Sequence, residues 1–328
     1  MNEHKGKIAG GIALLLAIFY FVAVYWSMEP ARFNVIDTAN AEAQARGEKV
    51  VVGYTTTTTL IKVAETLLNK PGGYLSNDVL PPSVLMDNMP AWEYGALEMV
   101  RDLALSMRKD FSRSQSQSTE HPSLKKAQPQ FNIGSTEWMW PSAEGEYQQG
   151  IQYLYDYRAH IADQKDANSQ FYARADNLRG WLKEAEKRLG SLSQRLSASV
   201  GQDRVNTDLA GDSAAHQATY APISSEVKTS WWQIDDVFYE SRGATWALLH
   251  FLKAVEHDFA DVLEKKNARI SLNQIVRELE ATQETVWSPI ILNGNGFGFV
   301  ANHSLVMANY ISRANAALIE LSELLAQG

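Results

Sequence analysis

The longest hydrophobic run of the chain lies near its N-terminus. Residues 8–28 read IAGGIALLLAIFYFVAVYWSM and carry no charge. A bilayer core of about 30 Å takes about 20 apolar residues in a helix, so the run is predicted to span a membrane once. Tyr25 and Trp26 stand at its end, where amphipathic rings anchor a helix in the headgroup layer.

A cleaved signal peptide is the alternative interpretation of this run. Cleavage needs small residues before the cut, whereas the run ends in the bulky sequence VAVYWSMEP, which favours an uncleaved anchor. Lys5 and Lys7 precede the run, and few cations follow it. The positive-inside rule then predicts a cytoplasmic N-terminus at 1–7, a membrane anchor at 8–28 and a remainder on the other side of the membrane.

The region after the anchor changes character twice. Residues 29–49 are small and polar with weak periodicity, and we expect a tether there. Residues 50–59, VVVGYTTTTT, are β-branched and predict a short strand or an extended lead-in to a helix at 60–69. A hydroxyl-lined ligand site is the less favoured interpretation of the threonines. A second helix is expected from 88 to 113, followed at 112–130 by a polar loop or a fraying helix end.

The clearest periodic pattern lies between residues 142 and 199. From Phe171 to Leu196, apolar residues recur at alternating spacings of four and three, a heptad seam typical of a coiled coil. If continuous over 143–199, this helix would be about 85 Å long. A second patterned stretch, 224–266, follows a polar connection at 201–222. We expect a long antiparallel hairpin, in which Leu182 and Leu189 face residues 248–262.

The remaining chain continues the helical pattern. Ser271 and Gln274 form a capping box for one further helix, and residues 302–326 form the last. There is no βαβ series and no regular alternation of strands and turns. The predicted fold class is therefore all-α: one transmembrane helix, then an elongated antiparallel helical bundle at 50–328 with at most one short strand.

Composition narrows the possible functions. The net charge of −8 argues against a nucleic-acid partner, because phosphate binding needs a basic surface. The absence of cysteine excludes a disulfide scaffold, a thiolate zinc site, an iron–sulfur cluster and a cysteine nucleophile. No phosphate-binding loop or serine nucleophile motif is present, so no cofactor and no catalytic residue is assigned.

Three residues are weak candidates for a metal site. His250, His257 and Asp261 follow one another at spacings of seven and four on a predicted helix, so they can share a face. No HExxH or ExxH motif supports them. A neighbouring apolar stripe makes a solvated or hydrogen-bonded polar face the favoured interpretation.

Aromatic residues supply the candidate interaction sites. The loop 293–299, NGNGFGF, lacks the strand and lysine of a phosphate loop. Phe297 and Phe299 are predicted to dock on a hydrophobic surface, either the protein's own helix ends, which we favour, or a protein partner. Trp231 and Trp232, with further rings at 138–140 and 147–157, are expected to fill the core or, less favoured, to line an interface.

Three blocks of the chain carry a resemblance to a known family. They read GYTTTTTLIKVAETLLNKPGGYLSND, PPSVLMDNMPAWEYGALEMVRDLALSMRKDFSRSQSQS and QPQFNIGSTEWMWPSAEGEY. The chain resembles, over nearly its whole length, a family of proteobacterial membrane proteins catalogued as a domain of unknown function. The resemblance implies a Gram-negative source, an inner-membrane anchor and a periplasmic body. It transfers no activity and no catalytic residue.

Three functional hypotheses follow. The leading one is a non-catalytic, membrane-anchored scaffold or interaction protein that contacts the bilayer through residues 8–28 and a protein partner in the envelope. The second is a ligand-binding or sensory module that acts through a membrane partner. The third is an envelope hydrolase with an unrecognised site, which clustering of acids and histidines in one cleft would favour. Self-association is compatible with all three.

Overall fold

Long helices account for most of the computed structural model, which describes residues 2–115, 118–163, 166, 169–205 and 224–327. In chain order the elements are α1 (Asn2–Trp26), α2 (Val35–Arg46), α3 (Tyr54–Asn69), η1 (Ser83–Leu85), α4 (Asn88–Ser106), η2 (Met107–Phe111), α5 (Pro122–Gln130), α6 (Ala143–Ala162), α7 (Ala175–Ser197), η3 (Ala198–Val200), β1 (Gln202–Val205), β2 (Ser224–Val227), η4 (Trp231–Gln233), α8 (Ile234–Asp258), α9 (Ala260–Lys265), α10 (Arg269–Ala281) and α11 (His303–Ala326). The predicted all-α class with an N-terminal apolar helix is confirmed.

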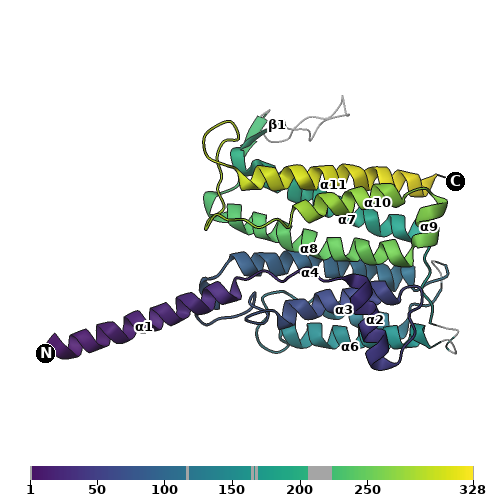
Figure 1. Cartoon of the computed structure of the whole chain (residues 1–328), viewed down its shortest axis with the longest axis horizontal. Coiled ribbons are helices and arrows are strands. Elements are labelled where there is room, and N and C mark those ends of the chain that lie inside the picture. Colours follow the sequence, from purple (N-terminus) through teal and green to yellow (C-terminus); the bar gives the residue numbers. More distant parts are fainter. Residues whose placement is uncertain (1, 116–117, 164–165, 167–168, 206–223, 328) are drawn as a thin grey trace, which may run out of the picture.

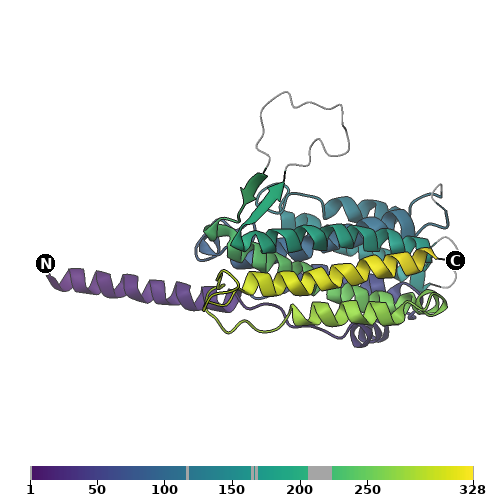
Figure 2. The same ribbon diagram turned by 90° about the horizontal axis from the view of Figure 1, so that it is seen from above.

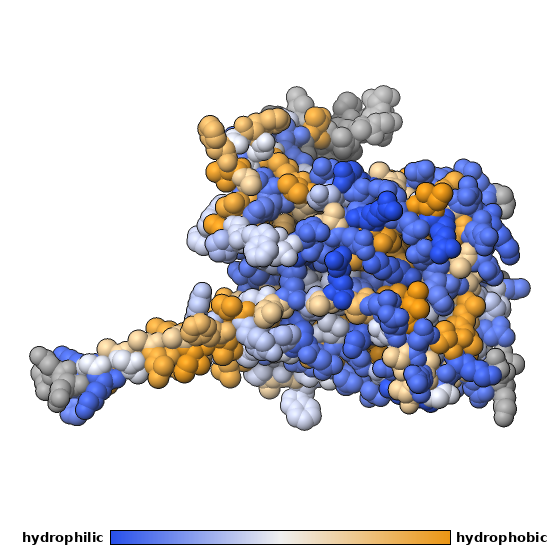
Figure 3. Space-filling view, in the orientation of Figure 1, coloured by the Kyte–Doolittle hydropathy of each residue, from blue (hydrophilic) through white to orange (hydrophobic). Residues whose placement is uncertain are grey.

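Helix α1 projects away from the body formed by the other helices (Figure 1). Among the described residues, His4–Trp26 is the one segment long and apolar enough to cross a membrane. Its apolar side chains are exposed around the helix, and they form the hydrophobic arm in Figure 3. A helix that is apolar on every side needs lipid or protein around it. We call the end of the body from which it leaves the α1 end.

The centre of the body is a pair of helices, α4 and α8, that run in the same direction. Near the α1 end the rings of Trp92 and Trp246 lie 5.2 Å apart, and at the far end those of Phe111 and Phe259 lie 5.3 Å apart. Helices α7, α10 and α11 pack on the α8 side, and α3 and α6 on the α4 side (Figures 1 and 2). One hydrophobic core runs through both groups.

The long heptad helix predicted for 143–199 is two helices. Helix α6 ends at Ala162 and α7 begins at Ala175, and the sequence that follows α6, DQKDANSQ, contains no large apolar residue. Helix α7 runs antiparallel to α8, as expected for a hairpin. Helix α7 packs mainly on α11, where Ser193 lies 2.5 Å from Ser312 and Gly190 lies beside Asn315. Leu182 and Leu189 are fully buried in the core, and their contact with residues 248–262 stays a prediction.

Four local predictions also change. Residues 29–49 contain α2, whose small side chains Ala39 and Ala43 are buried against the body. The threonines of 55–59 lie in α3, where Thr57 and Thr59 donate to the carbonyls four residues earlier, so no strand forms. The 112–130 loop includes α5. The capping box is absent, because α10 begins before Ser271.

The strands lie elsewhere than expected. β1 and β2 pair antiparallel, with Gln202 opposite Val227, at the ends of the 201–222 connection. The rest of that connection, from residue 206, falls outside the described residues. The last helix, α11, is confirmed, and Asn302 caps its N-terminus by accepting the Leu305 N–H at 2.8 Å.

Candidate functional site

The chain that follows α1 is fixed to the α1 end of the body. Glu29 accepts three hydrogen bonds of 2.7–3.0 Å from the Arg242 guanidinium of α8. Arg242 also donates to the carbonyl oxygens of Thr282 and Glu284, at 3.0 and 2.8 Å. These bonds satisfy a guanidinium that is almost fully buried. The apolar helix α1 is therefore joined to the body without a free linker.

The candidate anchor residues differ in their surroundings. Tyr25 is exposed, as an interfacial ring would be. Trp26 packs on the turn after α3, so closely that a Cβ on Gly72 would lie 2.7 Å from the indole. Gly72 has φ +85°, a conformation that glycine adopts freely. Trp26 therefore joins the anchor to the body as well as lying at the end of the predicted span.

His250 serves the structure of α8. Its ring stacks on Phe33 at 4.1 Å, and its Nε2 accepts the Phe33 backbone N–H at 3.1 Å. The proton is then on Nδ1, which donates to the Trp246 carbonyl at 2.7 Å. Burial lowers the pKa of His250 to about 4. Because both ring nitrogens are engaged, His250 offers no lone pair to a metal.

The other two metal candidates do not join it. The Nδ1 of His257 lies 3.2 Å from Asp258 and 3.2 Å from Thr55, and the hydrogen bond to Asp258 raises the pKa of His257. Asp258 also accepts the Thr56 N–H at 2.7 Å, so it fixes the start of α3. Asp261 is exposed. The described part of the chain contains no group of three histidines or acids placed to hold a metal ion.

A serine–histidine–aspartate group, absent from the sequence predictions, lies in a pocket of about 470 Å³ at the end opposite α1. His121 caps α5 by accepting the Ser123 N–H on Nδ1 at 3.2 Å, so its proton is on Nε2. Nε2 therefore donates to Ser169 Oγ at 2.8 Å, and Ser169 donates to Asp166 at 2.7 Å.

These hydrogen bonds run in the wrong direction for catalysis. A histidine that activates a serine must accept the hydroxyl proton. In this group the Ser169 proton points to Asp166 instead. Burial, with the nearby His160, lowers the pKa of His121, which keeps its ring neutral. The group is a hydrogen-bonded chain that fixes the start of α5.

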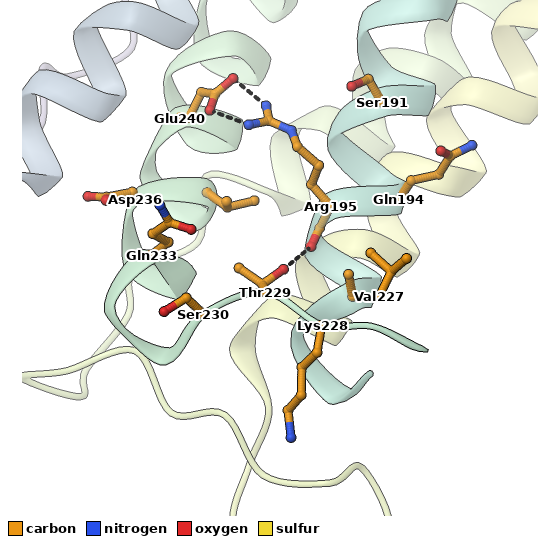
Figure 4. A pocket seen from close by; sticks show the side chains of 12 residues that line it. Ser191, Gln194, Arg195, Val227, Lys228, Thr229, Ser230, Gln233, Asp236 and Glu240 are labelled. Atoms are coloured by element: carbon orange, nitrogen blue, oxygen red, sulfur yellow. Dashed lines mark hydrogen bonds and ion pairs between the residues drawn. The ribbon is translucent and has the colours of Figure 1, made fainter. Parts of the chain in front are cut away.

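A polar pocket of about 580 Å³ lies between α7 and α8 (Figure 4). Arg195 forms a two-bond ion pair with Glu240 across it, and Thr229 donates to the Arg195 carbonyl at 3.1 Å. Burial, with the charge of Asp87, raises the pKa of Asp236 to about 6. In Figure 4 the Asp236 side chain points away from Arg195. The pocket therefore contains an ion pair whose two charges neutralise each other. Among the described residues that line it, no nucleophile is paired with a base.

An apolar pocket of about 420 Å³ lies between α8, the end of α10 and the start of α11. Phe238, Val286, Met307 and Tyr310 contribute to its walls, and Arg242 borders it. It therefore adjoins the Glu29–Arg242 joint. Such a wall suits an apolar group of a ligand.

The candidate interaction residues are all on the surface. Phe297 and Phe299 are fully exposed, so the favoured prediction that they plug the protein's own helix ends is wrong. The glycines of this loop would let the backbone turn the two rings toward the body, but they do not require that conformation. Trp231 and Trp232 are also exposed and pack edge to face at 5.2 Å. The rings at 147 and 157 are buried as expected, whereas Trp140 is almost fully exposed.

Several buried charges were missed in the sequence. Lys70 and Glu93 form a fully buried ion pair of 2.5 Å, and Glu93 also accepts the Ser76 N–H at 2.8 Å. Arg158 is buried between Thr58 of α3 and Glu48, at 3.3 and 3.1 Å. The clearest signal was the single charge of Glu93 between apolar residues in AWEYGAL, whereas Arg158 stands in YDYRAHI beside other polar residues and gave no such signal. Each pair fixes a loop or helix to its neighbour.

Comparison with known proteins defines the class of protein. A family of uncharacterized proteins conserved in bacteria, DUF2333, matches residues 2–328. The chain belongs to this family, which confirms the resemblance to a bacterial family of unknown function. No curated protein and no solved structure matches the chain.

Proposed function

We propose that this protein is a single-span inner-membrane protein whose helical body lies in the periplasm and acts, without catalysis, as a scaffold or interaction partner for another envelope component. The observation that carries the proposal is the joint between α1 and the body. Glu29 with Arg242, and Phe33 with His250, fix the chain to α8 directly after the apolar helix. A body held in this way presents its surfaces in a defined orientation to the membrane.

The orientation follows from the cations before α1. Lys5 and Lys7 favour a cytoplasmic N-terminus, which directs residues after α1 to the other side. The buried charged groups support a structural role for the body interior. Glu93 and Arg158 each bind partners from neighbouring segments, and they stabilise the packing.

Site-specific photo-crosslinking in intact cells tests the proposal. The crosslinking residue replaces exposed positions on different sides of the body, such as Lys187 of α7 and Arg269 of α10. We expect one side to yield a discrete envelope protein and the other to yield none. A body that gives no discrete product from any side, or products only with cytoplasmic proteins, contradicts the proposal.

A second candidate function, a ligand-binding module, is favoured by the apolar pocket beside Arg242. Native mass spectrometry of the full-length protein should then show a bound apolar molecule. The variant Met307→Trp, which fills the pocket, should release it. An unliganded wild-type protein contradicts this candidate and leaves the first untouched.

A further inference from the structure

Exposed aromatic rings are concentrated at one end of the body. The chain has nine tryptophans, and three of them are buried in the core between helices. Five others are more than half exposed and lie outside the α-helices, in loops or in the short η4: Trp138, Trp140, Trp231, Trp232 and Trp287. The exposed phenylalanines 297 and 299 lie in the loop before α11. We call these seven residues the aromatic end surface.

Each of the three segments that carry these tryptophans lies at the α1 end. The 138–140 loop follows Glu137, whose carbonyl oxygen accepts a 2.8 Å hydrogen bond from the Asn77 side chain. Asn77 belongs to the segment after α3, whose Gly72 lies against Trp26. Trp231 and Trp232 directly precede α8, whose first half holds Arg242. Trp287 follows Glu284, whose carbonyl binds that same arginine.

The loop of Phe297 and Phe299 lies at the same end. Asn293 donates to the Ser199 carbonyl at 3.0 Å, just after α7 ends, and Asn302 caps the start of α11. Both helix ends belong to the α1 end, and in Figure 1 the loops of residues 285–302 lie at that same left-hand end of the body, above α1. Hydrophobic colour covers these loops as well as α1 in Figure 3.

The distance between the membrane and this surface is limited by the chain. Trp26 ends α1, and Glu29 is already bound to Arg242. Three extended residues span at most about 10 Å. The polar layer on each side of a bilayer core is about 5–7 Å thick. If α1 spans the membrane, the α1 end must therefore lie at or in the headgroup layer.

Tryptophan is suited to that layer, because its ring is apolar and its N–H remains hydrogen-bonded to water or headgroups. Exposed apolar patches on soluble surfaces are otherwise small. We infer that the aromatic end surface inserts into the headgroup–acyl boundary of the leaflet from which α1 emerges, so that the body is held upright on the bilayer at several points. This inference rests on the proposed membrane span of α1.

The contact relies on aromatic rings more than on charge. Acidic residues border the same end, including Asp87, Asp235 and Asp236, and burial with neighbouring acids raises the pKa of Asp236 to about 6. Carboxylates are not attracted to anionic lipids. The contact should therefore form on a zwitterionic phosphatidylcholine bilayer and persist at high salt.

The absence of native cysteine allows a direct test with single-cysteine variants of the full-length protein. A fluorophore is attached at Phe299→Cys or Trp287→Cys, and the protein is reconstituted in phosphatidylcholine vesicles with or without lipids that carry a nitroxide quencher near the headgroup. Ile270→Cys, exposed at the opposite end of the body, is the matched control, and Phe21→Cys reports on α1.

We expect the lipid quencher to remove most of the emission at 21, 287 and 299 and little at 270. Emission that persists at both 287 and 299 while 21 is quenched overturns the inference and favours a protein partner for these rings. Emission that persists at 21 means that α1 does not lie in the bilayer, and the proposed function fails with it. Quenching at 270 to the same extent as at 299 would indicate unspecific adsorption and also overturns the inference.

Discussion

Gly243 of α8 lies where this helix crosses α4, and its replacement by alanine tests the closest packing in the body. A Cβ at 243 would lie 1.9 Å from the Trp92 carbonyl oxygen, and one at Gly95 would lie 1.9 Å from the Glu240 carbonyl oxygen. Contacts between such atoms normally begin at about 3.3 Å. Because both obstacles are backbone atoms, the two helices must separate by more than about 1 Å.

The separation has a calculable cost. Overpacking of a core costs about 1–3 kcal/mol, and backbone movement places this site at the upper end. The higher helix propensity of alanine returns about 1 kcal/mol. The net loss for Gly243→Ala is therefore about 2 kcal/mol. Each kcal/mol lowers the melting temperature by roughly 2–4 °C in domains of 150–250 residues, so we expect a decrease of several degrees.

Circular dichroism at 222 nm of the full-length protein in detergent measures this change. Gly180→Ala in α7 is the matched control, because its helical backbone faces open space and a Cβ there meets nothing within 4 Å. It should melt at the same temperature as wild type or slightly higher. Equal melting of Gly243→Ala and Gly180→Ala would refute the close crossing of α4 and α8.

Three further predictions follow from the packing and the joint. Leu189→Ala removes a fully buried side chain and should destabilise the protein by about 2–5 kcal/mol in chemical denaturation, whereas Lys187→Ala on the exposed face should have no effect. Equal losses from the two variants would contradict the burial of the apolar face of α7. The pKa of His250 is lowered from 6.5 in the unfolded chain to about 4 in the folded protein. Between these two values the unfolded chain binds a proton that the folded chain does not. Up to about 3 kcal/mol of the free energy of unfolding is therefore lost as the pH falls from 6.5 to about 4. His250→Asn should show a smaller difference between melting at pH 7.5 and pH 4.5 than wild type, and an unchanged difference would contradict the buried neutral ring. Glu29→Gln leaves the buried Arg242 without its charge partner and should cost about 3 kcal/mol in the same denaturation assay, and a neutral outcome would show that the joint does not form.

The sequence predicted the helices well wherever one face of the pattern was apolar over several turns. The run at 8–28, the stop after Asn69 and the start of α6 at Ser142 all appear in the structure. Local signals determine these features, because caps, prolines and long apolar runs act within a few residues.

Which helices of the chain pack against one another could not be predicted in the same way. The seam of α7 shows which face is buried, but several helices offer a complementary stripe. The contact with α11 depends on small residues such as Gly190 and Ser193, which allow close approach and carry no periodic signal.

The interaction residues show a second limit. Hydrophobic residues in a loop predict burial only if the protein itself supplies the surface. Phe297 and Phe299 were expected to dock on the protein's own helix ends because exposure of such rings to water is unfavourable, yet both are fully exposed, and the sequence does not say which surface outside the protein would cover them. Conversely, Glu93 and Arg158 look like surface charges in a linear pattern, and only the fold shows their buried partners.

The central claim, a body held on the periplasmic face of the inner membrane by α1, is tested most directly by a reporter fused after Gly328. Alkaline phosphatase is active only outside the cytoplasm, and a fluorescent protein that folds only in the cytoplasm provides the matched control. The account predicts high phosphatase activity in the membrane fraction and no fluorescence. Fluorescence with an inactive phosphatase would show that the body lies in the cytoplasm, and active phosphatase released in soluble form would show that α1 is not a permanent anchor.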